Sequence, residues 1–596
     1  MQPYPGPTTG GTAADSSSDA DTGSGGFGAG LLTVAGWILF FGCVTLFLLL
    51  HSPALGTTSN LVIESWPGVF EPIRQSVVGV LEQINGGGDF GLLSSRLYHA
   101  ILVLLFGVYF FVLYRAFRSG APAFRPGSAP LVVILVLTSA MLAVLLFAPG
   151  AFTGDLFSYV WYGRVFGTHG GNPYIDVPFQ YAAEGTANWL QYLYWKDLPA
   201  PYGPVWVLLA GTIDILARAL GSGIVLHVLG HKLLACVVHL ANTWMLWHVA
   251  PRVIANFWPA REAAPEGSTQ PHENGTPAAR SPGVDVRQRS ARVSVTLAYA
   301  WNPLLLVEFG VSGHNDGLVI FALLAAIRLH LAGRWRWAVV ALALGTLVKV
   351  TVGLAFLVPY LGFLFWQARA DRATPLAASR LLRIGQAAAI VAVVWVVAWV
   401  PFWEGPDTVR AYTNNPGSLF YIHSLGTIIR YTVPFEVDRI ADEQGWPIAG
   451  SWNAEAIGNS LDQPTRYVLQ AIAVLIALFH IWRARTFRGL LVALWWAVFA
   501  YLAIGAIWYW PWYASWLVVP MALLGPGRLF TAGQIMCVTS LVVHGLNPAT
   551  SAVFAPWWAW SGLVINLPPL LYLAGSWLME AARRRAERLQ PATAAQ

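Results

Sequence analysis

The sequence predicts an all-α integral membrane protein that crosses the bilayer many times. Of its 596 residues, 56% are hydrophobic and only 11% are charged, and the mean hydropathy is +0.56. A soluble domain carries about 25% charged residues. Many apolar runs are close to 20 residues long, which is the length of a helix that crosses a ~30 Å hydrocarbon core. The alternation of an outer-membrane barrel is absent from the sequence.

The charge and the cysteines exclude several other classes of protein. The formal net charge is +6, but most basic residues lie in short segments between apolar runs, where they indicate orientation rather than nucleic-acid binding. Cys43, Cys236 and Cys537 each lie inside an apolar run, which argues against disulfides and metal sites. We therefore expect no nucleic-acid partner, no metal and no cofactor.

The composition of the N-terminal region predicts a disordered tail followed by a transmembrane helix that is not cleaved off. Residues 1–30 are mostly Gly, Ser, Thr, Ala, Pro and Asp, a composition typical of a disordered tail. The apolar run 31–51 has no basic segment before it and no clear cleavage site after it. It is therefore interpreted as a transmembrane helix and not as a signal peptide.

Hydropathy predicts about 14 crossings. The region 203–250 is long enough for two helices with a break at Gly-Ser-Gly near 221, and we favour one full crossing plus a short re-entrant or half-inserted helix after Tyr202-Gly203-Pro204. The other expected helices are 31–51, 97–118, 130–148, 293–310, 317–332, 336–349, 350–367, 384–402, 466–483, 490–507, 513–530, 532–548 and 562–580.

The distribution of Lys and Arg predicts the orientation. Basic segments such as RAFRSGAPAFR, RARTFR and EAARRRAERLQ are expected in the cytoplasm, which places both termini inside. Six Arg between 251 and 292 place that loop inside too, so 203–250 must cross an odd number of times. The segments expected outside are 52–96, 149–202, 311–316, 403–465, 508–512 and 549–561.

A transporter is the general alternative for such a chain. Transporters show internal repeats and paired broken helices, and their polar residues follow a path across the membrane. This sequence has no convincing repeat, and its polar residues gather at the outer ends of the helices. The pattern favours chemistry at one face of the membrane.

The first polar cluster is GDLFSYVWYGRVFGTHGGNPY, residues 154–174. Asp155 could be a helix-end carboxylate in water, but the aromatic residues after it could form a low-dielectric wall that makes it a better general base. The aromatics themselves could be an interfacial belt or surfaces for sugars and prenyl chains. The further candidates in this cluster are Tyr159, Tyr162, Arg164, His169, Asn172 and Tyr174.

Two more clusters are Tyr202-Gly203-Pro204 and the stretch WNPLLLVEFGVSGHNDG at 301–317. Asn315 or Asp316 could cap the following helix, and a helix N-terminus beside His314 is also an anion site. Glu308 lies in an apolar helix with no basic residue within a turn of it. Ionisable residues at membrane depth are functional candidates. The candidates in the longer stretch are Asn302, Glu308, His314, Asn315 and Asp316.

Lys349 lies between two runs that are short for full crossings, near the outer tip of a possible hairpin. It could extend toward the interface, or it could provide a point charge for a phosphate, with Arg164 as a second cation. The later cluster WYWPWY at 508–513 adds Trp510 and Tyr513.

Two other patterns carry less weight. Asp19-Ala20-Asp21 has the D-x-D form of metal-dependent sugar-nucleotide enzymes, but it lies in the predicted tail. His227 and His231 have the spacing of a zinc pair, but no third ligand is near in sequence and Lys232 argues against a cation.

The motifs together resemble the GT-C superfamily of membrane glycosyltransferases, and more closely the bacterial polyprenol-phosphate-mannose-dependent alpha-(1,6)-mannosyltransferases. The resemblance covers roughly 130–530. It rests on D-x-x-S-Y-x-x-x-G from Asp155, G-x-N-P-Y ending at Tyr174, Y-G-P at 202–204, W-N-P-L at 301–304, G-H-N-D at 313–316 and W-P-W-Y at 510–513. It implies an N-terminal transmembrane extension at 31–129, a catalytic membrane domain at 130–580 and a basic cytoplasmic tail at 581–596.

The resemblance implies a reaction as well. A mannosyl residue would pass with inversion from a polyprenyl-phosphate donor to a glycan or glycolipid acceptor, at the outer face of the plasma membrane. Asp155 would be the base, with Lys349, Arg164 and His314 at the donor phosphate. The residues expected to contact the substrates are Tyr159, Tyr162, His169, Asn172, Tyr174, Tyr202, Asn302, Glu308, Asn315, Asp316, Trp510 and Tyr513. The alternatives are another lipid-phosphate sugar such as arabinose, or a flippase of lipid-linked glycans.

Overall fold

The structure is a computed structural model, and its described part omits several segments of the chain. The described residues are 29–52, 55, 60–118, 129–149, 152–181, 187–221, 223–257, 282–369, 375–409, 420–446, 453–546 and 557–589. The predictions for residues 1–28, which include Asp19-Ala20-Asp21, and for the last seven residues of the chain lie outside the described residues.

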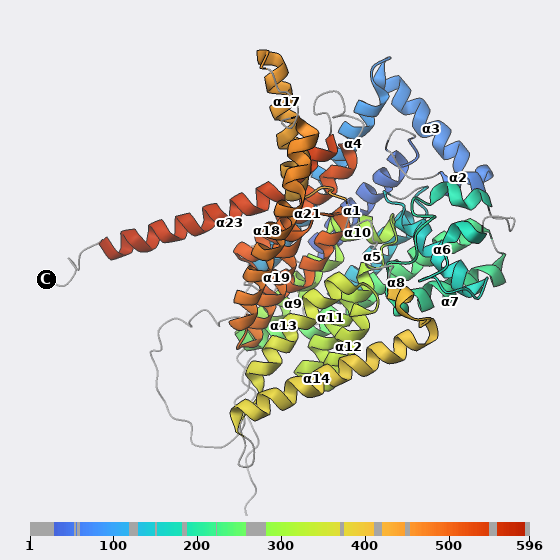
Figure 1. Ribbon diagram of the computed structural model, residues 1–596. Coiled ribbons are helices and arrows are strands. Elements are labelled where there is room, and N and C mark those ends of the chain that lie inside the picture. The colour runs from blue at the N-terminus through green and yellow to red at the C-terminus, as the bar shows by residue number, and fades with distance from the viewer. Residues whose placement is uncertain are drawn as a thin grey trace, which may run out of the picture.

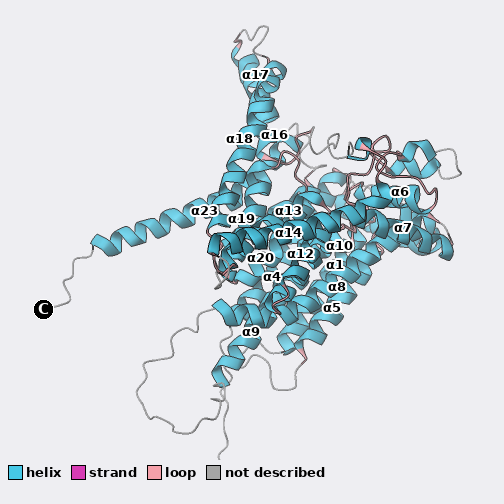
Figure 2. Ribbon diagram, turned by 60° about the horizontal axis from the view of Figure 1, so that its bottom comes forward, coloured by secondary structure: helices cyan, strands magenta, loops and turns pink. Residues whose placement is uncertain are grey.

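The described chain folds into helices without a strand, which confirms the all-α class (Figure 1). A bundle of long helices forms the body; α17 lies at one end of it and α23 projects from its side in both overall views (Figure 2). The α-helices are α1 (Ala29–Leu49), α2 (Leu61–Ser65), α3 (Pro67–Asn85), α4 (Phe90–Arg118), α5 (Pro130–Leu146), α6 (Asp155–Gly167), α7 (Pro204–Leu220), α8 (Ile224–Phe257), α9 (Pro282–Ala300), α10 (Pro303–Gly310), α11 (Asp316–Leu331), α12 (Trp335–Thr346), α13 (Val350–Gln367), α14 (Leu376–Trp399), α16 (Leu425–Thr427), α17 (Val433–Gln444), α18 (Ala454–Trp482), α19 (Phe487–Ala500), α20 (Val518–Leu524), α21 (Arg528–Val542) and α23 (Trp557–Leu589).

Shorter turns of 3-10 or π-helix complete the described elements. They are η1 (Pro178–Tyr181), η2 (Ala187–Tyr192), η3 (Val400–Phe402), η4 (Pro406–Val409), η6 (Ile428–Thr432), η8 (Tyr501–Gly505), η9 (Pro511–Leu517) and η10 (Val543–Gly545).

Eight of the described helical segments are long and apolar enough to cross a membrane. The helices Pro130–Leu146 and Pro511–Leu524 are apolar but shorter. The polytopic membrane class is therefore confirmed, while the total of about 14 crossings stays a prediction. The region 203–250 contains two helices, α7 and α8, which meet at Gly221 as expected, and α8 is the one long enough to span.

Two predicted helices are wrong in their continuity. The expected helix 293–310 is broken into α9 and α10 at Trp301-Asn302. Pro303 cannot donate a backbone hydrogen bond to the preceding turn, and Asn302 instead caps α10 by accepting from the Leu304 amide at 3.0 Å. The expected helix 513–530 likewise divides into η9 and α20, and α21 begins at Arg528 rather than at 532.

Hydropathy also missed helices in segments expected outside. α3 lies within 52–96, α6 within 149–202 and α17 within 403–465. These helices are shorter or more polar than a spanning helix, so a window tuned to 20 apolar residues does not detect them. α6 carries the whole of the D-x-x-S-Y-x-x-x-G motif.

Glycines set the position of α6 against α7. A Cβ atom on Gly163 would lie 2.6 Å from the Ala210 carbonyl oxygen, and one on Gly167 would lie 2.8 Å from the Gly211 carbonyl oxygen. Both contacts are with backbone, so the two helices can approach this closely only without side chains at these positions. The final Gly of the motif therefore fixes the helix that begins with Asp155.

The Tyr202-Gly203-Pro204 segment packs on the turn between α12 and α13. The Gly203 amide donates to the Val348 carbonyl at 3.2 Å, and the Val205 amide donates to the Leu347 carbonyl at 3.0 Å. A Cβ atom on Gly203 would lie 2.0 Å from the Leu347 carbonyl oxygen. This segment therefore supports the turn that presents Lys349.

Candidate active site

Asp155 is the first residue of α6, where the positive end of the helix dipole favours a carboxylate. The Asp155 side chain is half-buried, and the Tyr202 side chain hydrogen-bonds to it. Burial raises the pKa of the Asp155 carboxyl above its ordinary value of 3.8. The charges of His314 and Lys349 oppose this rise, whereas Asp316 adds to it. The structure therefore brings Asp155, Lys349, His314 and Asp316 within electrostatic reach of one another.

Lys349 is held by an ion pair in the turn before α13. Its Nζ lies 3.0 Å from Asp316 Oδ1 and 3.1 Å from Oδ2, and its side chain is only 13% exposed. The Trp516 indole donates to the same Asp316 oxygen at 2.6 Å. The Lys349 ammonium also lies 4.7 Å from the Tyr513 ring centroid and 5.6 Å from that of Trp516. A compact cation is thus fixed against two aromatic faces.

A second group of ionisable residues surrounds Glu308. His544 Nε2 lies 2.8 Å from Glu308 Oε1, and His314 Nε2 lies 3.4 Å from Oε2. The His314 ring stacks on Trp512 at 3.9 Å, and Trp512 stacks on Trp510 at 5.1 Å. Glu308 and His314 are fully buried. The aromatic run 508–513 and the G-H-N-D motif therefore meet in three dimensions.

Asn315 connects this group to α6. Its side chain makes no capping hydrogen bond to α11, although capping was one interpretation of this residue. The Asn315 Oδ1 atom instead accepts from the Tyr159 hydroxyl at 3.3 Å. Tyr159 packs edge-on against Tyr202 at 5.1 Å and Trp206 at 4.7 Å. Tyr159, Tyr202 and Asn315 thus lie beside Asp155.

Other candidates of the first cluster hold the loop together. The Asn172 Nδ2 atom donates to the Phe402 carbonyl at 2.8 Å and to Glu404 at 2.9 Å. The Tyr174 hydroxyl donates to the Tyr202 carbonyl at 2.8 Å, and the Tyr162 hydroxyl donates to the Leu198 carbonyl at 3.0 Å. The His169 ring stacks on Tyr181 at 4.4 Å. Their contact with substrate stays a prediction, and the bonds formed here are structural.

Asn302 lies in a different network. Besides capping α10, its Nδ2 atom lies 3.4 Å from the Tyr109 hydroxyl and 3.5 Å from Gln534 Oε1. Tyr109 and Gln534 belong to α4 and α21, so these bonds join three helices. The residue does not contact the group around Asp155 through any bond in the described chain.

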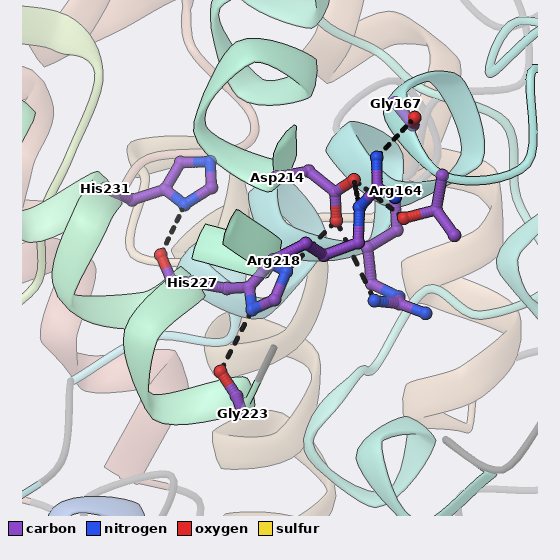
Figure 3. Close-up of polar contacts among 8 residues, drawn as sticks. Arg164, Gly167, Asp214, Arg218, Gly223, His227 and His231 are labelled. Atoms are coloured by element: carbon purple, nitrogen blue, oxygen red, sulfur yellow. Dashed lines mark hydrogen bonds and ion pairs between the residues drawn. The ribbon is translucent and has the colours of Figure 1, made fainter. Parts of the chain in front are cut away.

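Arg164 faces Asp214 (Figure 3). Its guanidinium lies 3.7 Å from the Asp214 carboxylate, which also pairs with Arg218 at 3.2 Å and His227 at 3.1 Å. The Thr168 hydroxyl donates to Asp214 at 2.7 Å. This carboxylate therefore joins α6, α7 and α8, and His227 is used in that joint. A phosphate-binding role for Arg164 stays a prediction.

Sequence reasoning missed three residues of these groups. His544 and Asp214 are ionisable residues inside apolar runs, and that signal alone would have marked them. Trp516 lies three residues after Tyr513, so it falls on the same side of the turn of helix, and the periodicity could have placed it there.

Comparison with known proteins agrees with the motifs. A family described as alpha-(1->6)-mannopyranosyltransferase, N-terminal domain, matches residues 69–260 and 284–367. The chain is 24% identical over 367 residues to alpha-(1->6)-mannopyranosyltransferase B of Corynebacterium glutamicum, a match that covers 56% of this chain and 54% of that protein. It is 28% identical over 190 residues to alpha-(1->6)-mannopyranosyltransferase Rv1459c of Mycobacterium tuberculosis, with 32% of this chain and 26% of that protein covered.

The chain thus spans about half the length of the first relative and about a quarter of the second. The family match begins in α3 and ends with α13, so it includes Asp155, His314, Asp316 and Lys349. The match and these relatives support the resemblance of the chain to bacterial alpha-(1->6)-mannosyltransferases of the GT-C type.

Proposed function

We propose that this protein transfers a mannosyl residue from a polyprenyl-phosphate donor to a hydroxyl of a glycan or glycolipid acceptor, with inversion at the anomeric carbon. The observation that carries the proposal is the position of Asp155 beside the Lys349–Asp316 pair. A carboxylate and a fixed cation in one site are the two groups that such a displacement needs. The names of the relatives and the order of the motifs support mannose as the sugar.

Asp155 acts as the general base. The acceptor oxygen forms a bond to the anomeric carbon while the bond from that carbon to the phosphate oxygen breaks, and the acceptor proton passes to the Asp155 carboxylate. Partial burial raises the pKa of Asp155, which brings its basicity closer to that of an effective base near neutral pH. The Tyr202 side chain orients the carboxylate by its hydrogen bond.

Lys349 stabilises the leaving lipid phosphate. An ammonium has three N–H donors, and the Lys349 ammonium donates to both oxygens of Asp316. The remaining donor is available to a phosphate oxygen on which negative charge grows as the glycosyl bond breaks. His314 is the second candidate for this role, because it precedes Asp316 by two residues and lies close enough to Asp155 for an electrostatic interaction.

The aromatic stack of His314, Trp512 and Trp510 provides flat apolar faces beside these charges. Such faces suit the C–H side of a sugar ring or the first isoprene units of the donor. Tyr513 lies next to Lys349 and closes the site on that side.

The site is proposed to face the outer side of the plasma membrane. The positive-inside rule places 149–202, 311–316 and 508–512 outside. A backbone bridge joins Ile422 to Trp508, so the segments 403–465 and 508–512, both expected outside, also meet in the fold.

The proposal is tested by incubating membranes that contain the protein with labelled β-mannosyl-phosphoryl polyprenol and an alkyl α-mannoside acceptor. We expect a labelled dimannoside with an α linkage, because inversion converts a β donor to an α product. A β-linked product would contradict inversion, and transfer from an arabinosyl donor but not from the mannosyl donor would contradict the sugar. Movement of the lipid across the membrane without a new glycoside would indicate a flippase instead.

A further inference from the structure

A pocket of about 310 Å³ lies at the ends of α18, α19 and α21. We call it the arginine pocket; its defining residues are Arg488, Arg528, His480, Trp496, Trp577 and the loop 525–527. The His480 ring stacks on Trp496 at 4.9 Å with an angle of 3°, and Trp496 stacks on Trp577 at 5.9 Å. The pocket therefore combines two guanidinium groups with an ordered aromatic wall.

An apolar groove of about 640 Å³ continues from the arginine pocket between α18, α23 and the segment Phe487–Gly505, which contains α19 and η8. The two hollows share His480, Trp496 and Trp577. Beyond these residues the groove is lined by Leu475, Ile476, Phe479, Ile504, Leu570 and Leu573. All three lining helical segments are long and apolar enough to cross a membrane, so the groove is expected to run along the hydrocarbon core.

The arginine pocket lies far from Asp155 and Lys349. Lys349 directly precedes α13, and Gln367 is the last residue of that helix. The Gln367 side chain donates to the carbonyl of Arg485 at 3.0 Å, and Arg485 lies three residues before Arg488. The 18 residues of α13 are about 27 Å long at 1.5 Å per residue. The two sites are therefore separated by roughly the thickness of the hydrocarbon core.

Positive charge predominates around the arginine pocket. Arg528 and Arg584 both pair with the carboxylate of Glu580. Arg488 is exposed and forms no hydrogen bond or ion pair with any described residue. Two guanidinium groups thus share one carboxylate, and the third, that of Arg488, has no carboxylate partner among the described residues. The N-terminus of α21 adds a partial positive charge, since Gly527 provides no side chain to cap it.

We propose that the arginine pocket and its groove bind an anionic glycerophospholipid of the inner leaflet. Its phosphate would lie between Arg488, Arg528 and the first amides of α21, because guanidinium groups and helix N-termini both bind phosphate. An acyl chain would lie along the apolar groove, against Phe479, Leu570 and the edge of Trp577. The positive-inside rule predicts this end of the helices in the cytoplasm, where an anionic leaflet attracts basic residues.

Native mass spectrometry of the full chain in detergent tests this site. Phosphatidylglycerol and phosphatidylcholine with the same acyl chains are added in turn. We expect phosphatidylglycerol to bind several-fold more tightly than phosphatidylcholine. Arg488→Gln and Arg528→Gln should each weaken phosphatidylglycerol binding about fivefold, since each basic residue near an anionic lipid contributes a factor of this order. Arg334→Gln, which removes an exposed cation from another basic segment, should leave binding unchanged.

A second variant tests the groove without changing charge. Ala574 lines the groove and is exposed, so Ala574→Trp should fill it and weaken both lipids without disturbing buried packing. Leu578→Trp places the same ring on an exposed position of α23 that does not line the groove, and it is the control. Equal binding of the two lipids by the unchanged protein, or an undiminished preference in the double arginine variant, would overturn the proposal. Displacement of phosphatidylglycerol by equimolar polyprenyl phosphate would overturn the assigned occupant.

Discussion

The Lys349 ammonium lies 3.0 Å from the Asp316 carboxylate. The two residues belong to different helices, since Lys349 directly precedes α13 and Asp316 is the first residue of α11. Asp316 is fully buried and also accepts from the Trp516 indole at 2.6 Å. A buried ion pair persists when its remaining valences are satisfied. The ion pair with Asp316 therefore fixes the position at which the Lys349 ammonium would contact the donor phosphate in the proposed reaction.

Replacing Lys349 should affect stability and transfer together. Lys349→Met leaves the buried Asp316 carboxylate without its cation, which should lower the free energy of unfolding by about 3 kcal/mol. Transfer should fall about 100-fold or more, because the leaving phosphate loses its electrostatic partner. Thermal unfolding in detergent and initial rates measure both effects. If Lys349→Met lowered stability but left the rate per folded molecule unchanged, Lys349 would be structural only.

Replacing Gly203 should displace Lys349 without touching it. A Cβ atom at this position would lie 2.0 Å from the Leu347 carbonyl oxygen, so the turn that carries Lys349 must move. A shift of about 1 Å in a catalytic group can lower a rate about 100-fold. We expect Gly203→Ala to lower kcat by about that factor, as measured by initial rates at saturating donor. Gly107→Ala is the control, because no atom lies within 4 Å of a Cβ atom there.

The pH dependence of transfer should report the pKa of Asp155. Because burial raises this pKa above 3.8, kcat/KM should begin to fall at a higher pH than an ordinary Asp would give. Loss of the Lys349 charge should move the acid limb to higher pH, and loss of the Asp316 charge should move it to lower pH. Residual activity of Lys349→Met and Asp316→Asn, measured from pH 4 to 8, gives the two shifts. If the acid limb shifted in the opposite directions, the charges of Lys349 and Asp316 would not act on Asp155 as the structure indicates.

The raised pKa of Asp155 also predicts how the free energy of unfolding changes with pH. A raised pKa means that the folded state binds the Asp155 proton more tightly than the unfolded state. The contribution of Asp155 is therefore complete below pH 3.8 and is lost as the pH rises through the folded pKa. Asp155→Asn should remove this dependence, which denaturation at several pH values can measure.

Asp214 should be important for folding but not for chemistry. Asp214→Asn weakens the pairing of Arg164, Arg218 and His227 (Figure 3), so the free energy of unfolding should fall by about 3 kcal/mol. The rate per folded molecule should stay within about twofold, since ion pairs act locally. A loss of transfer as large as that of a base variant, with folding preserved, would bring the Asp214 group into the mechanism.

The sequence predicted that Asp155, His314 and Lys349 meet, but not how the polar side chains pair. Alternation of apolar runs placed Asp155, His314 and Lys349 at the same ends of helices, and the structure brings them together. The pairing of Lys349 with Asp316 and of Arg164 with Asp214 depends on how non-adjacent helices pack, which no local pattern encodes. Asn302 illustrates the same limit: its motif predicted a substrate contact, while its side chain caps α10 and bonds toward α4 and α21.

Short helices were harder to predict than long ones for a physical reason. α6 and α3 are not long apolar spans, so hydropathy gives them no signal, and their position comes from tertiary contacts such as Gly163 against Ala210. Pro303 could have predicted the break between α9 and α10, but the apolar run of 293–310 is continuous and favoured a single helix.

The most direct test of the central claim is the transfer rate of Asp155→Asn, with labelled β-mannosyl-phosphoryl polyprenol and an alkyl α-mannoside. Asp197→Asn, an exposed carboxylate of the same predicted outer segment, is the matched control. We expect Asp155→Asn to lose at least about 100-fold in kcat while donor binding and thermal stability are retained, and Asp197→Asn to keep full activity. A transfer rate of Asp155→Asn equal to that of the unchanged protein would contradict the assignment of Asp155 as the base.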